Sequence, residues 1–588
     1  MGINRKTKYY APPGLLMVAG FLLVATASAS AQTAAPESQT AAQNNDPVTK
    51  AFRPAGTRAS SEIDLLKAQL AAQQDELAAL RKAVEEQGKL IARVLQTNAN
   101  SVTPTTNLAV GSAASDDNKL AGRGAGPPAN SAPSTADPLL RSSQASAEQE
   151  KPSPLSFRIG TAQFTPFGFV DFTAVVRDKN TGSGIGTNFG AIPFNNTVNS
   201  NLREFRLSAQ NSRLGLRVDA KVRGMDLLGY LETDFLGLAP GNVAVTSNSD
   251  TQRLRLIWVD LRKKKLEILA GQSWSMLTPN RKGLSPLPAD IFFGQGVDTN
   301  YLLGLTWSRN PQLRLIYHAN DTVTLGWSIE ASEQYGGGSN GSGAITLPSA
   351  LASSYGPQLD TGNSTFGVPN PLQDNIVKIA FDPKSEGRAM HFEVAGLLRR
   401  FAFFNPFSNQ HFNATGGGVS FNGNVEVVKN FRLIANTFYS MGGGRWIFGQ
   451  GPDLIIRGDG SPSLVRSAST VDGFEYEATP NTLFYAYYGG AYFKKAVAID
   501  PVNGQQVGFG YTGSPSNHNR AIQEGTFGFT HTFWRDPNYG AMQFMVQYSY
   551  LVRHPWYVAP GQPGSANANM LFLNLRYTLP GAPPSAKK

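Results

Sequence analysis

Residues 213–223, RLGLRVDAKVR, place two chemically different sets of side chains at alternate positions. A period of two belongs to a β-strand, because successive side chains point to opposite faces. A soluble sandwich strand turns its apolar face to a core, whereas a transmembrane barrel strand turns it to lipid and its polar face to a wet lumen. The length also suits a tilted strand that crosses a bilayer. One set is aliphatic and the other is almost entirely charged: Leu214, Leu216, Val218, Ala220 and Val222 against Arg213, Gly215, Arg217, Asp219, Lys221 and Arg223.

The same alternation recurs after Pro154 in about sixteen to eighteen runs. Turn-forming residues separate some runs, and long segments rich in Gly, Asn and Ser separate others. Short turns at one rim and long loops at the other are typical of an outer-membrane barrel. Examples are the turns RNPQ at 309–312 and HAND at 318–321, the segments 333–373, 442–470 and 494–522, and the run in which Leu254, Leu256 and Trp258 oppose Arg253 and Arg255.

The competing fold is a series of soluble β-sandwiches. Two features favour the barrel: aromatic residues lie near strand ends, as in TLFYAYYGGAYF at 482–493, and arginines follow one another on the polar faces. Barrel closure also removes the unpaired edges that a bilayer does not tolerate. The sequence therefore predicts an all-β transmembrane antiparallel barrel of about sixteen strands over 155–579, followed by a C-terminal tail at 580–588, with an N-terminal α-helical coiled-coil segment.

The N-terminus predicts export. Residues 1–31 combine a basic start, an apolar run from Leu15 to about Ala25, and the cleavage pattern Ala29-Ser30-Ala31, which is typical of a secretory signal peptide. The alternative is an uncleaved membrane anchor, for which the apolar run is short. The prediction that follows is an outer-membrane protein with a periplasmic N-terminal extension.

The next 123 residues predict a helical rod between two flexible segments. Residues 61–96 carry an a/d heptad, with Ile63 and Leu66 as its first a and d residues, which predicts a coiled coil about 50 Å long. Because a lone amphipathic helix has nothing against which to bury its seam, the pattern predicts association, in two or three strands. The alternative is a helix folded back onto the barrel. Residues 32–60 and 97–154 are rich in Ala, Ser and Pro and predict flexible linkers.

Composition limits the possible chemistry. The chain of 588 residues has no cysteine, so disulfides and thiolate metal sites are excluded, and its formal charge of +10 suits anionic partners. No basic helix or stacking motif suggests nucleic acid. None of the six histidines lies in a hydrolase or metalloprotease motif. His531 has the alternatives of a catalytic contact with a serine or a polar place in the lumen, and the second is preferred. We expect no catalytic residue, metal or cofactor; Ca²⁺ in the loops is left open.

The leader, heptad helix, linker and barrel, together with LEILAGQSWSML at 266–277 and PADIFFGQG at 288–296, resemble the DcaP-like porins of Gram-negative outer membranes. The phosphate-selective porins are a neighbouring family. The resemblance implies a homotrimer of sixteen-stranded barrels, each narrowed by an inward-folded loop and passing small anions such as dicarboxylates, with the coiled coil in the periplasm. The chain departs from outer-membrane barrels that end on an aromatic residue, because PGAPPSAKK follows Tyr577-Thr578-Leu579.

The polar faces supply candidate pore residues. An arginine on the lipid face near the bilayer centre would cost about 2–4 kcal/mol, so the charged face of 213–223 is expected to line the lumen. Arginine offers a planar fork suited to carboxylate or phosphate. Asp219, Glu232, Asp234 and Asp260 are expected to brace these arginines or to form an opposing acidic wall. The predicted pore-lining, anion-binding residues are Arg203, Arg206, Arg213, Arg217, Lys221, Arg253 and Arg255, and the predicted constriction loop carries Arg281, Lys282 and Asp290 within 278–300.

The function predicted is therefore a passive porin for small, preferably anionic solutes, in contact with outer-membrane lipids. The alternatives are a structural anchor that grips the cell wall through the coiled coil and a barrel enzyme. For each basic residue, the alternative role is a structural salt bridge or a rim contact with lipid phosphate. The sequence leaves open the solute, the strand register and the number of strands in the coiled coil.

Overall fold

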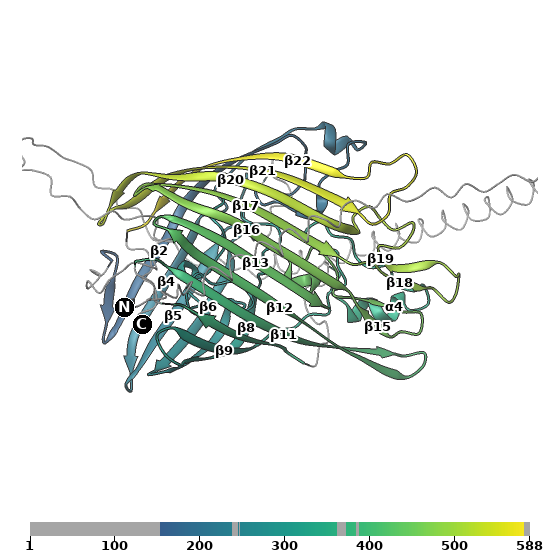
Figure 1. The fold of residues 1–588 in the computed structure, drawn as a ribbon, viewed down its shortest axis with the longest axis horizontal. Helices are drawn as coiled ribbons and strands as arrows, with labels where there is room; N and C mark the ends of the chain where they lie inside the picture. Colours follow the sequence, from purple (N-terminus) through teal and green to yellow (C-terminus); the bar gives the residue numbers. More distant parts are fainter. Residues whose placement is uncertain (1–152, 238–244, 246, 362–371, 384–386, 581–588) are drawn as a thin grey trace, which may run out of the picture. The chain divides into compact units, whose positions relative to one another are not determined.

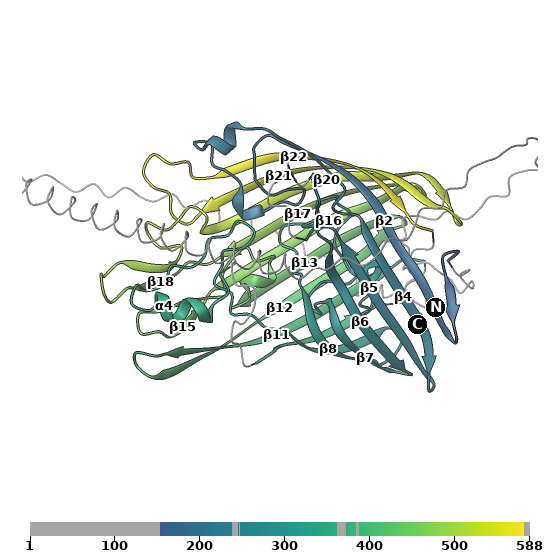
Figure 2. The same cartoon turned by 180° about the vertical axis from the view of Figure 1, so that it is seen from behind.

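A closed antiparallel barrel forms the described part of the chain (Figures 1 and 2). The computed structural model describes residues 153–237, 245, 247–361, 372–383 and 387–580. One sheet of eighteen strands runs through this region, in which β1 (Phe157–Ile159) and β3 (Glu204–Ser208) are short strands beside β2. The other sixteen strands close the wall, so the predicted barrel and its approximate strand number are confirmed.

The wall strands follow one another around the barrel in chain order. They are β2 (Ala162–Arg177), β4 (Arg213–Val222), β5 (Met225–Asp234), β6 (Arg253–Lys263), β7 (Leu266–Trp274), β8 (Arg309–His318), β9 (Val323–Glu330), β10 (Asp374–Phe381), β11 (Met390–Asn405), β12 (Gln410–Val428), β13 (Phe431–Met441), β16 (Arg466–Thr479), β17 (Thr482–Phe493), β20 (Asn519–Asp536), β21 (Gly540–Pro555) and β22 (Ala566–Thr578).

The first and last wall strands close the barrel. β2 pairs with β22 in the register Phe169↔Thr578 to Arg177↔Met570. On its other side β2 pairs with β4 near its start and with β3 near its end. Every wall strand therefore has a neighbour on each side, and no edge of the closed wall is left open to a bilayer.

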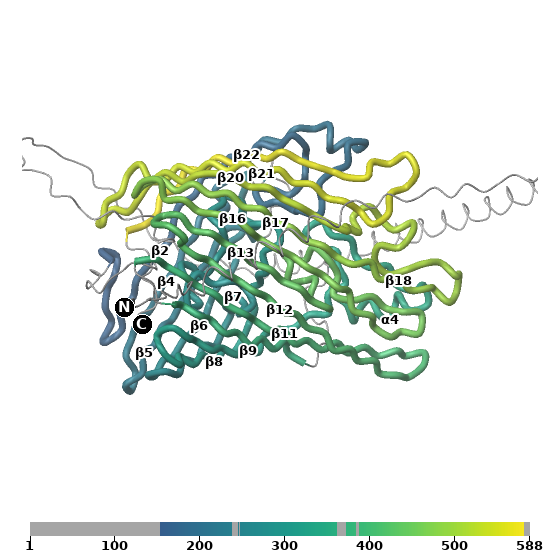
Figure 3. Tube along the Cα trace, in the orientation of Figure 1, coloured from purple at the N-terminus to yellow at the C-terminus, as the bar shows by residue number. Residues whose placement is uncertain are grey.

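Connections at the two ends of the barrel differ in length. Two residues join β4 to β5, β6 to β7, β12 to β13 and β16 to β17 at one end. The other end carries long segments that contain hairpins β14 (Leu454–Ile456)–β15 (Pro462–Leu464) and β18 (Ala496–Ile499)–β19 (Gln506–Phe509), helix α4 (Ala352–Tyr355) and the helical turns η2 (Phe189–Ala191), η3 (Val198–Asn201), η4 (Pro288–Asp290), η5 (Gly356–Gln358) and η6 (Gly444–Trp446). The chain trace shows the short-turn end at the left and the long-loop end at the right (Figure 3).

The two faces of the wall have opposite chemistry. Along β2, Val170 and Phe172 are 58% and 49% exposed, whereas Asp171 and Thr173 between them are buried. Along β4 the exposed Leu214 likewise alternates with inward Arg213. Apolar residues thus face outward and polar ones inward, which is the arrangement that hydrocarbon surroundings and a polar lumen require.

A β-bulge overturns one predicted face. The pairing of β5 with β6 shifts between Glu232 and Thr233, which leaves Arg255 as the extra residue of β6. The alternation is therefore reversed beyond it, because a bulge moves all later side chains to the other face. The prediction that Leu254, Leu256 and Trp258 share one face is wrong: Leu254 is 45% exposed, while Leu256 and Trp258 are buried inside.

The turn predicted at 309–312 is also wrong, because these residues begin β8. Pro311 pairs with Gln272 of β7, and its carbonyl accepts a hydrogen bond from the Ala331 N–H. In an antiparallel strand, the N and O of one residue point to the same side. The N–H that proline lacks would therefore face Ala331 at the end of β9, and the Ala331 carbonyl accepts a hydrogen bond from Arg445 NH2 at 3.0 Å instead. The turn predicted at 318–321 does follow β8.

The 34-residue segment 275–308, which we call the inner segment, joins β7 to β8 and lies inside the barrel. Its Met276, Leu277, Val297 and Leu303 belong to a buried apolar cluster with inward side chains of the wall. The segments 185–194 and 345–359 contribute to the same cluster. The buried core of the described region therefore lies inside the barrel, where wall side chains pack against connections that fold inward.

Several predictions concern residues outside the described part. These are the signal peptide at 1–31, the flexible segment at 32–60, the coiled coil at 61–96, all but the last two residues of the linker at 97–154, and residues 581–588 of the tail. They stay predictions. No helix among the described residues is long and apolar enough to span a membrane.

Candidate anion site in the barrel lumen

Arg255 is the centre of a charged network on the inner wall. Its Nε donates to Glu232 Oε1 at 2.5 Å and its NH1 donates to Asp234 Oδ2 at 2.6 Å, while NH2 donates to the Tyr301 hydroxyl at 3.0 Å. The bulge in β6 gives Arg255 this inward position beside two carboxylates of β5. All of these side chains except Tyr301 are nearly fully buried. The pairing compensates charges that would otherwise be costly to bury.

Two further predicted arginines share these carboxylates. Arg253 Nε donates to Asp234 Oδ1 at 2.8 Å, and Arg213 NH1 lies 3.6 Å from Glu232 Oε1. Arg253 and Arg213 keep 37% and 18% of their side chains exposed. Both side chains therefore keep part of their surface exposed, while Arg255 binds the same two acids.

Arg309 is a fourth cation, which the sequence reasoning missed. Its guanidinium carbon lies 5.4 Å from the ring centre of Trp274 and 5.8 Å from that of Trp307. Among the described residues it forms no ion pair, and its buried NH1 has no hydrogen-bond partner. Cation–π contacts hold such a group without neutralising it. Arg309 was not predicted as a pore residue because 309–312 was predicted to be a turn. The sequence Trp307-Ser308-Arg309 nevertheless places an aromatic residue and a cation close together.

The inner segment completes this site with aromatic rings. Tyr301 stacks on Phe293 at a centroid distance of 4.8 Å, and Trp274 lies 4.4 Å from Phe293 and 5.9 Å from Trp307. We call the assembly the arginine–aromatic cluster. It consists of Arg213, Arg253, Arg255, Arg309, Glu232, Asp234, Trp274, Phe293, Tyr301 and Trp307.

The cluster carries excess positive charge. Its four arginines face two carboxylates, a formal excess of two charges (4 − 2). The pKa of Tyr301 is consistent with this positive charge. Burial disfavours the phenolate, but the neighbouring Arg255, Arg213 and Arg309 outweigh burial and lower the pKa of Tyr301. A positive field in a confined lumen attracts anions.

The other predicted pore residues lie apart from this cluster. Arg206 is paired with Glu204, and Arg217 donates to both oxygens of Asp219 at 2.7 Å. Lys221, at the short-turn rim, is 85% exposed and lies 3.7 Å from Asp226. These residues of β3 and β4 have the inward position in the alternation, but each has its own acidic partner. Of the acids predicted to brace the arginines, Asp219, Glu232 and Asp234 do so.

Arg203 requires a correction. It precedes β3, is exposed, and has the position in the alternation that places Phe205 and Leu207 outward, at 65% and 55% exposure. The sequence analysis predicted that Arg203 and Arg206 both line the lumen. Two residues three apart on a strand point to opposite faces, so they do not share the lumen.

The predicted constriction loop lies within the inner segment. Arg281 forms a two-pronged ion pair with Glu475 of β16, at 2.8 and 2.6 Å, and both side chains are buried. The backbone N–H of Arg281 donates to the Asp290 carbonyl at 2.7 Å, while Lys282 is partly exposed. The segment thus extends from β7 to an acid on the twelfth wall strand.

The C-terminal part of the inner segment is anchored to other strands. The Val297 N–H donates to Gln547 Oε1 of β21 at 2.5 Å. Asp298 accepts from the N–H groups of Thr187 at 3.2 Å and Asn300 at 2.8 Å, and burial raises the pKa of Asp298. The segment is therefore held at several points of the wall.

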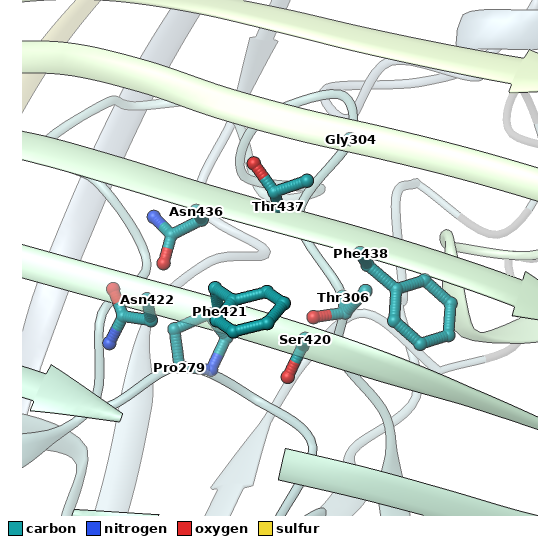
Figure 4. Close-up of a pocket in the computed structure, with 9 residues that line it drawn as sticks. All are labelled: Pro279, Gly304, Thr306, Ser420, Phe421, Asn422, Asn436, Thr437 and Phe438. Atoms are coloured by element: carbon teal, nitrogen blue, oxygen red, sulfur yellow. The ribbon is translucent and has the colours of Figure 1, made fainter. Parts of the chain in front are cut away.

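A small cavity of about 10 Å³ lies between the inner segment and the wall (Figure 4). Figure 4 shows Pro279 and Thr306 of the segment beside Asn422 and Asn436 of β12 and β13. The whole side-chain amide of Asn436 and the Oδ1 of Asn422 have no hydrogen-bond partner. The space is about that of one water molecule, which would satisfy these groups.

His531 does not face the lumen. It pairs with Phe544, which is 39% exposed, and its Nδ1 lies 2.9 Å from the Thr482 hydroxyl on the outer surface. The prediction of a polar histidine in the lumen is therefore wrong, because the strand register places 531 with the outward residues. No group of three or more acidic or histidine ligands suitable for a metal occurs in the described ranges.

Comparison with solved structures identifies the class of fold. The barrel is similar to the outer-membrane channel DcaP of Acinetobacter baumannii, with a TM-score of 0.52 and 18% identity over 72% of this chain and 99% of that chain. The fold is thus that of an outer-membrane porin, and the resemblance to the DcaP-like porins is confirmed for the fold.

Two other similar structures are more distant. They are an anion-selective porin from Comamonas acidovorans (12% identity, 71% of this chain and 100% of that chain, TM-score 0.41) and OprB of Pseudomonas putida (10%, 70% and 94%, 0.38). No protein-family model matches the sequence, and no curated protein is significantly similar to it.

Proposed function

We propose that this protein is an outer-membrane porin that passes small anions by passive diffusion through the arginine–aromatic cluster. The observation that carries the proposal is the excess of two positive charges around Trp274, on the inner wall of a closed barrel. Arg213, Arg253 and Arg309 offer guanidinium donors to an anion, while Arg255 binds the buried carboxylates of Glu232 and Asp234. Guanidinium forks match carboxylates and phosphates, so small dicarboxylates are the favoured solutes.

The inner segment is proposed to narrow this path. Arg281 anchors it to Glu475, and the aromatic side chains of Phe293 and Tyr301 extend from it into the cluster. A solute would therefore pass between charged wall residues and the segment. Lys282 and Asp290 remain candidate constriction residues of the same segment. Arg206, Arg217 and Lys221 are candidate lumen residues whose acidic partners weaken their contribution.

The test is ion selectivity in a planar bilayer. The purified protein is placed in a KCl gradient, and the reversal potential is expected to show preference for Cl⁻ over K⁺. Arg253→Ala combined with Arg255→Ala should reduce both this preference and the flux of dicarboxylates in a vesicle-swelling assay. Lys263→Ala combined with Lys264→Ala, at the exposed turn between β6 and β7, is the charge-matched control. Cation preference of the unaltered protein would overturn the proposal.

We also propose a homotrimer whose barrels assemble through their walls. The wall of the described barrel is closed by the pairing of β2 with β22. Deletion of 61–96 is therefore expected to leave trimers on native gels and three-step conductance in bilayers. Monomers after this deletion would assign trimerisation to the predicted coiled coil instead.

A further inference from the structure

Exposed cations gather on neighbouring strands at the long-loop end of the wall. Arg466 begins β16, Lys494 and Lys495 follow β17, and Arg520 lies near the start of β20. All four are exposed, and among the described residues none has a carboxylate within ion-pair distance. The alternation gives Arg466 the outward position, because it pairs with Met441, which is 41% exposed. We call these four residues the rim cations.

The rim cations lie side by side on neighbouring strands. The Lys494 N–H donates to the Arg466 carbonyl at 2.9 Å, which makes these two residues cross-strand neighbours. β17 in turn pairs with β20 up to Tyr492↔Ala521, next to Arg520. Register irregularity between Asn519 and Ala521 leaves Arg520 as an extra residue. Four cations thus lie on adjacent strands with no carboxylate partner among the described residues, an arrangement that suits an external anion.

An aromatic side chain lies between these cations. Lys495 Nζ is 5.8 Å, and the Arg520 guanidinium carbon 5.9 Å, from the ring centre of Trp556. The indole N–H donates to the Phe493 carbonyl at 2.9 Å, which fixes the ring, and the ring contacts outward Tyr492 at 6.2 Å. Tyr492 is 43% exposed on the lipid face. Trp556 therefore lies at the level where aromatic belts mark the boundary of the hydrocarbon.

A cavity opens beside the same tryptophan. It has a volume of about 90 Å³ and is lined by Lys495, Gln506, Tyr511, Thr512, Trp556 and Tyr557, among others. A larger residue at Gly510 would collide with the Trp556 ring, since an added Cβ would approach Trp556 Cδ1 to 2.5 Å. The cavity thus offers flat rings, hydroxyl and amide groups, and flanking cations within one small site.

We propose that this rim site binds the phosphorylated sugar headgroup of an outer-leaflet glycolipid. The cations match phosphate, and the rings of Trp556 and Tyr511 match the apolar face of a sugar. The position at the end of the apolar wall matches a headgroup whose acyl chains lie against Tyr492 and the strands below. Clusters of Lys and Arg beside a hydrophobic surface bind anionic headgroups. The site lies outside the barrel, so it rests on the outer-membrane location proposed above but not on the solute path.

The experiment measures binding of bisphosphorylated lipid A to the purified protein in detergent by native mass spectrometry. The variant R466Q/K494Q/K495Q/R520Q is expected to bind about tenfold or more weakly than the unaltered protein. The matched control R223Q/K263Q/K264Q/K429Q removes four exposed cations from the short-turn end and should bind normally. Dephosphorylated lipid A should bind weakly to all three proteins.

Equal binding of lipid A by the rim variant and the unaltered protein would overturn the proposal. So would an equal loss in the control variant, or equal binding of dephosphorylated lipid A. Two further measurements separate binding from folding. The charge-preserving variant R466K/R520K should keep its lipid, and bilayer conductance of every variant should be unchanged. Normal lipid binding in a protein that shows no anion preference would overturn the proposed anion-selective porin function. It would not affect the proposal for the rim site.

Discussion

Arg281 of the inner segment and Glu475 of β16 form an ion pair in which the two guanidinium NH groups bind the two carboxylate oxygens, at 2.8 and 2.6 Å. Both side chains are only 4% exposed. The pair joins two residues 194 positions apart and fixes the segment against the far wall. Glu475 also accepts from the Tyr487 hydroxyl at 2.7 Å, so its carboxylate is fully engaged.

Replacing Arg281 by methionine is therefore expected to loosen the inner segment. Removal of one partner from a buried pair leaves the other charge uncompensated and costs about 3–5 kcal/mol. We expect a lower free energy of unfolding and a larger, noisier single-channel conductance. Glu475→Gln in the same chain removes the stranded charge and should restore much of the stability but not the narrow conductance. Unchanged conductance in Arg281→Met would show that the segment does not limit the path.

Replacement by glutamine is expected to affect protein stability differently at Arg309 and at Arg255. Arg309→Gln removes a lumen cation that has no carboxylate partner among the described residues, so anion preference should fall with little loss of stability. Arg255→Gln also removes one charge, but it strands Glu232 and Asp234 and should cost about 3–5 kcal/mol. Reversal potentials and denaturant unfolding of both variants make the comparison. Equal destabilisation by the two changes would contradict the view that Arg309 is held by ring contacts rather than by an ion pair.

Anion preference should also depend on pH through Tyr301. Its phenol is neutral at low pH, and the arginines around it lower its pKa, so a negative charge forms there more readily than on an ordinary tyrosine. That charge would reduce the excess of the cluster from two to one. The preference for Cl⁻ is thus expected to decrease as pH rises through the alkaline range. Tyr301→Phe is the matched control and should show a smaller decrease; an identical pH profile would exclude Tyr301 as the titrating group.

The sequence was sufficient to predict the barrel as a whole, but not every strand of its wall and not the site. Alternation along 213–223 depends only on local geometry, so it predicted the faces of β4 correctly. The bulge at Arg255 depends on pairing with β5, and neither it nor the reversed faces of Leu256 and Trp258 leave a local signal. Pro311 suggested a turn, because proline is rare inside strands. Whether β8 can accommodate it depends on where the neighbouring strand β9 ends, which the local sequence does not show. Glu475 pairs with a residue 194 positions away, and such a contact has no periodicity.

Asp472 places a carboxylate on the outer face of the wall, where it does not suit lipid. Asp472 of β16 pairs with Tyr488, which is 45% exposed, and its Oδ2 accepts from the Thr470 hydroxyl at 2.7 Å. It lies between outward Tyr476, near one end of the strand, and Arg466, at the other. A carboxylate at this depth destabilises a barrel in lipid, although by less than the roughly 2–4 kcal/mol of a basic residue.

Asp472→Val is therefore expected to raise the free energy of unfolding in lipid vesicles, measured by urea titration, because it replaces a carboxylate on the lipid face by an apolar side chain of similar size. Thr470→Val serves as the control, since it removes only the hydroxyl that donates to Asp472, and it should change stability little. A loss of stability accompanied by a loss of trimers in Asp472→Val would contradict this expectation. That result would show that a neighbouring subunit, rather than lipid, covers this face of β16.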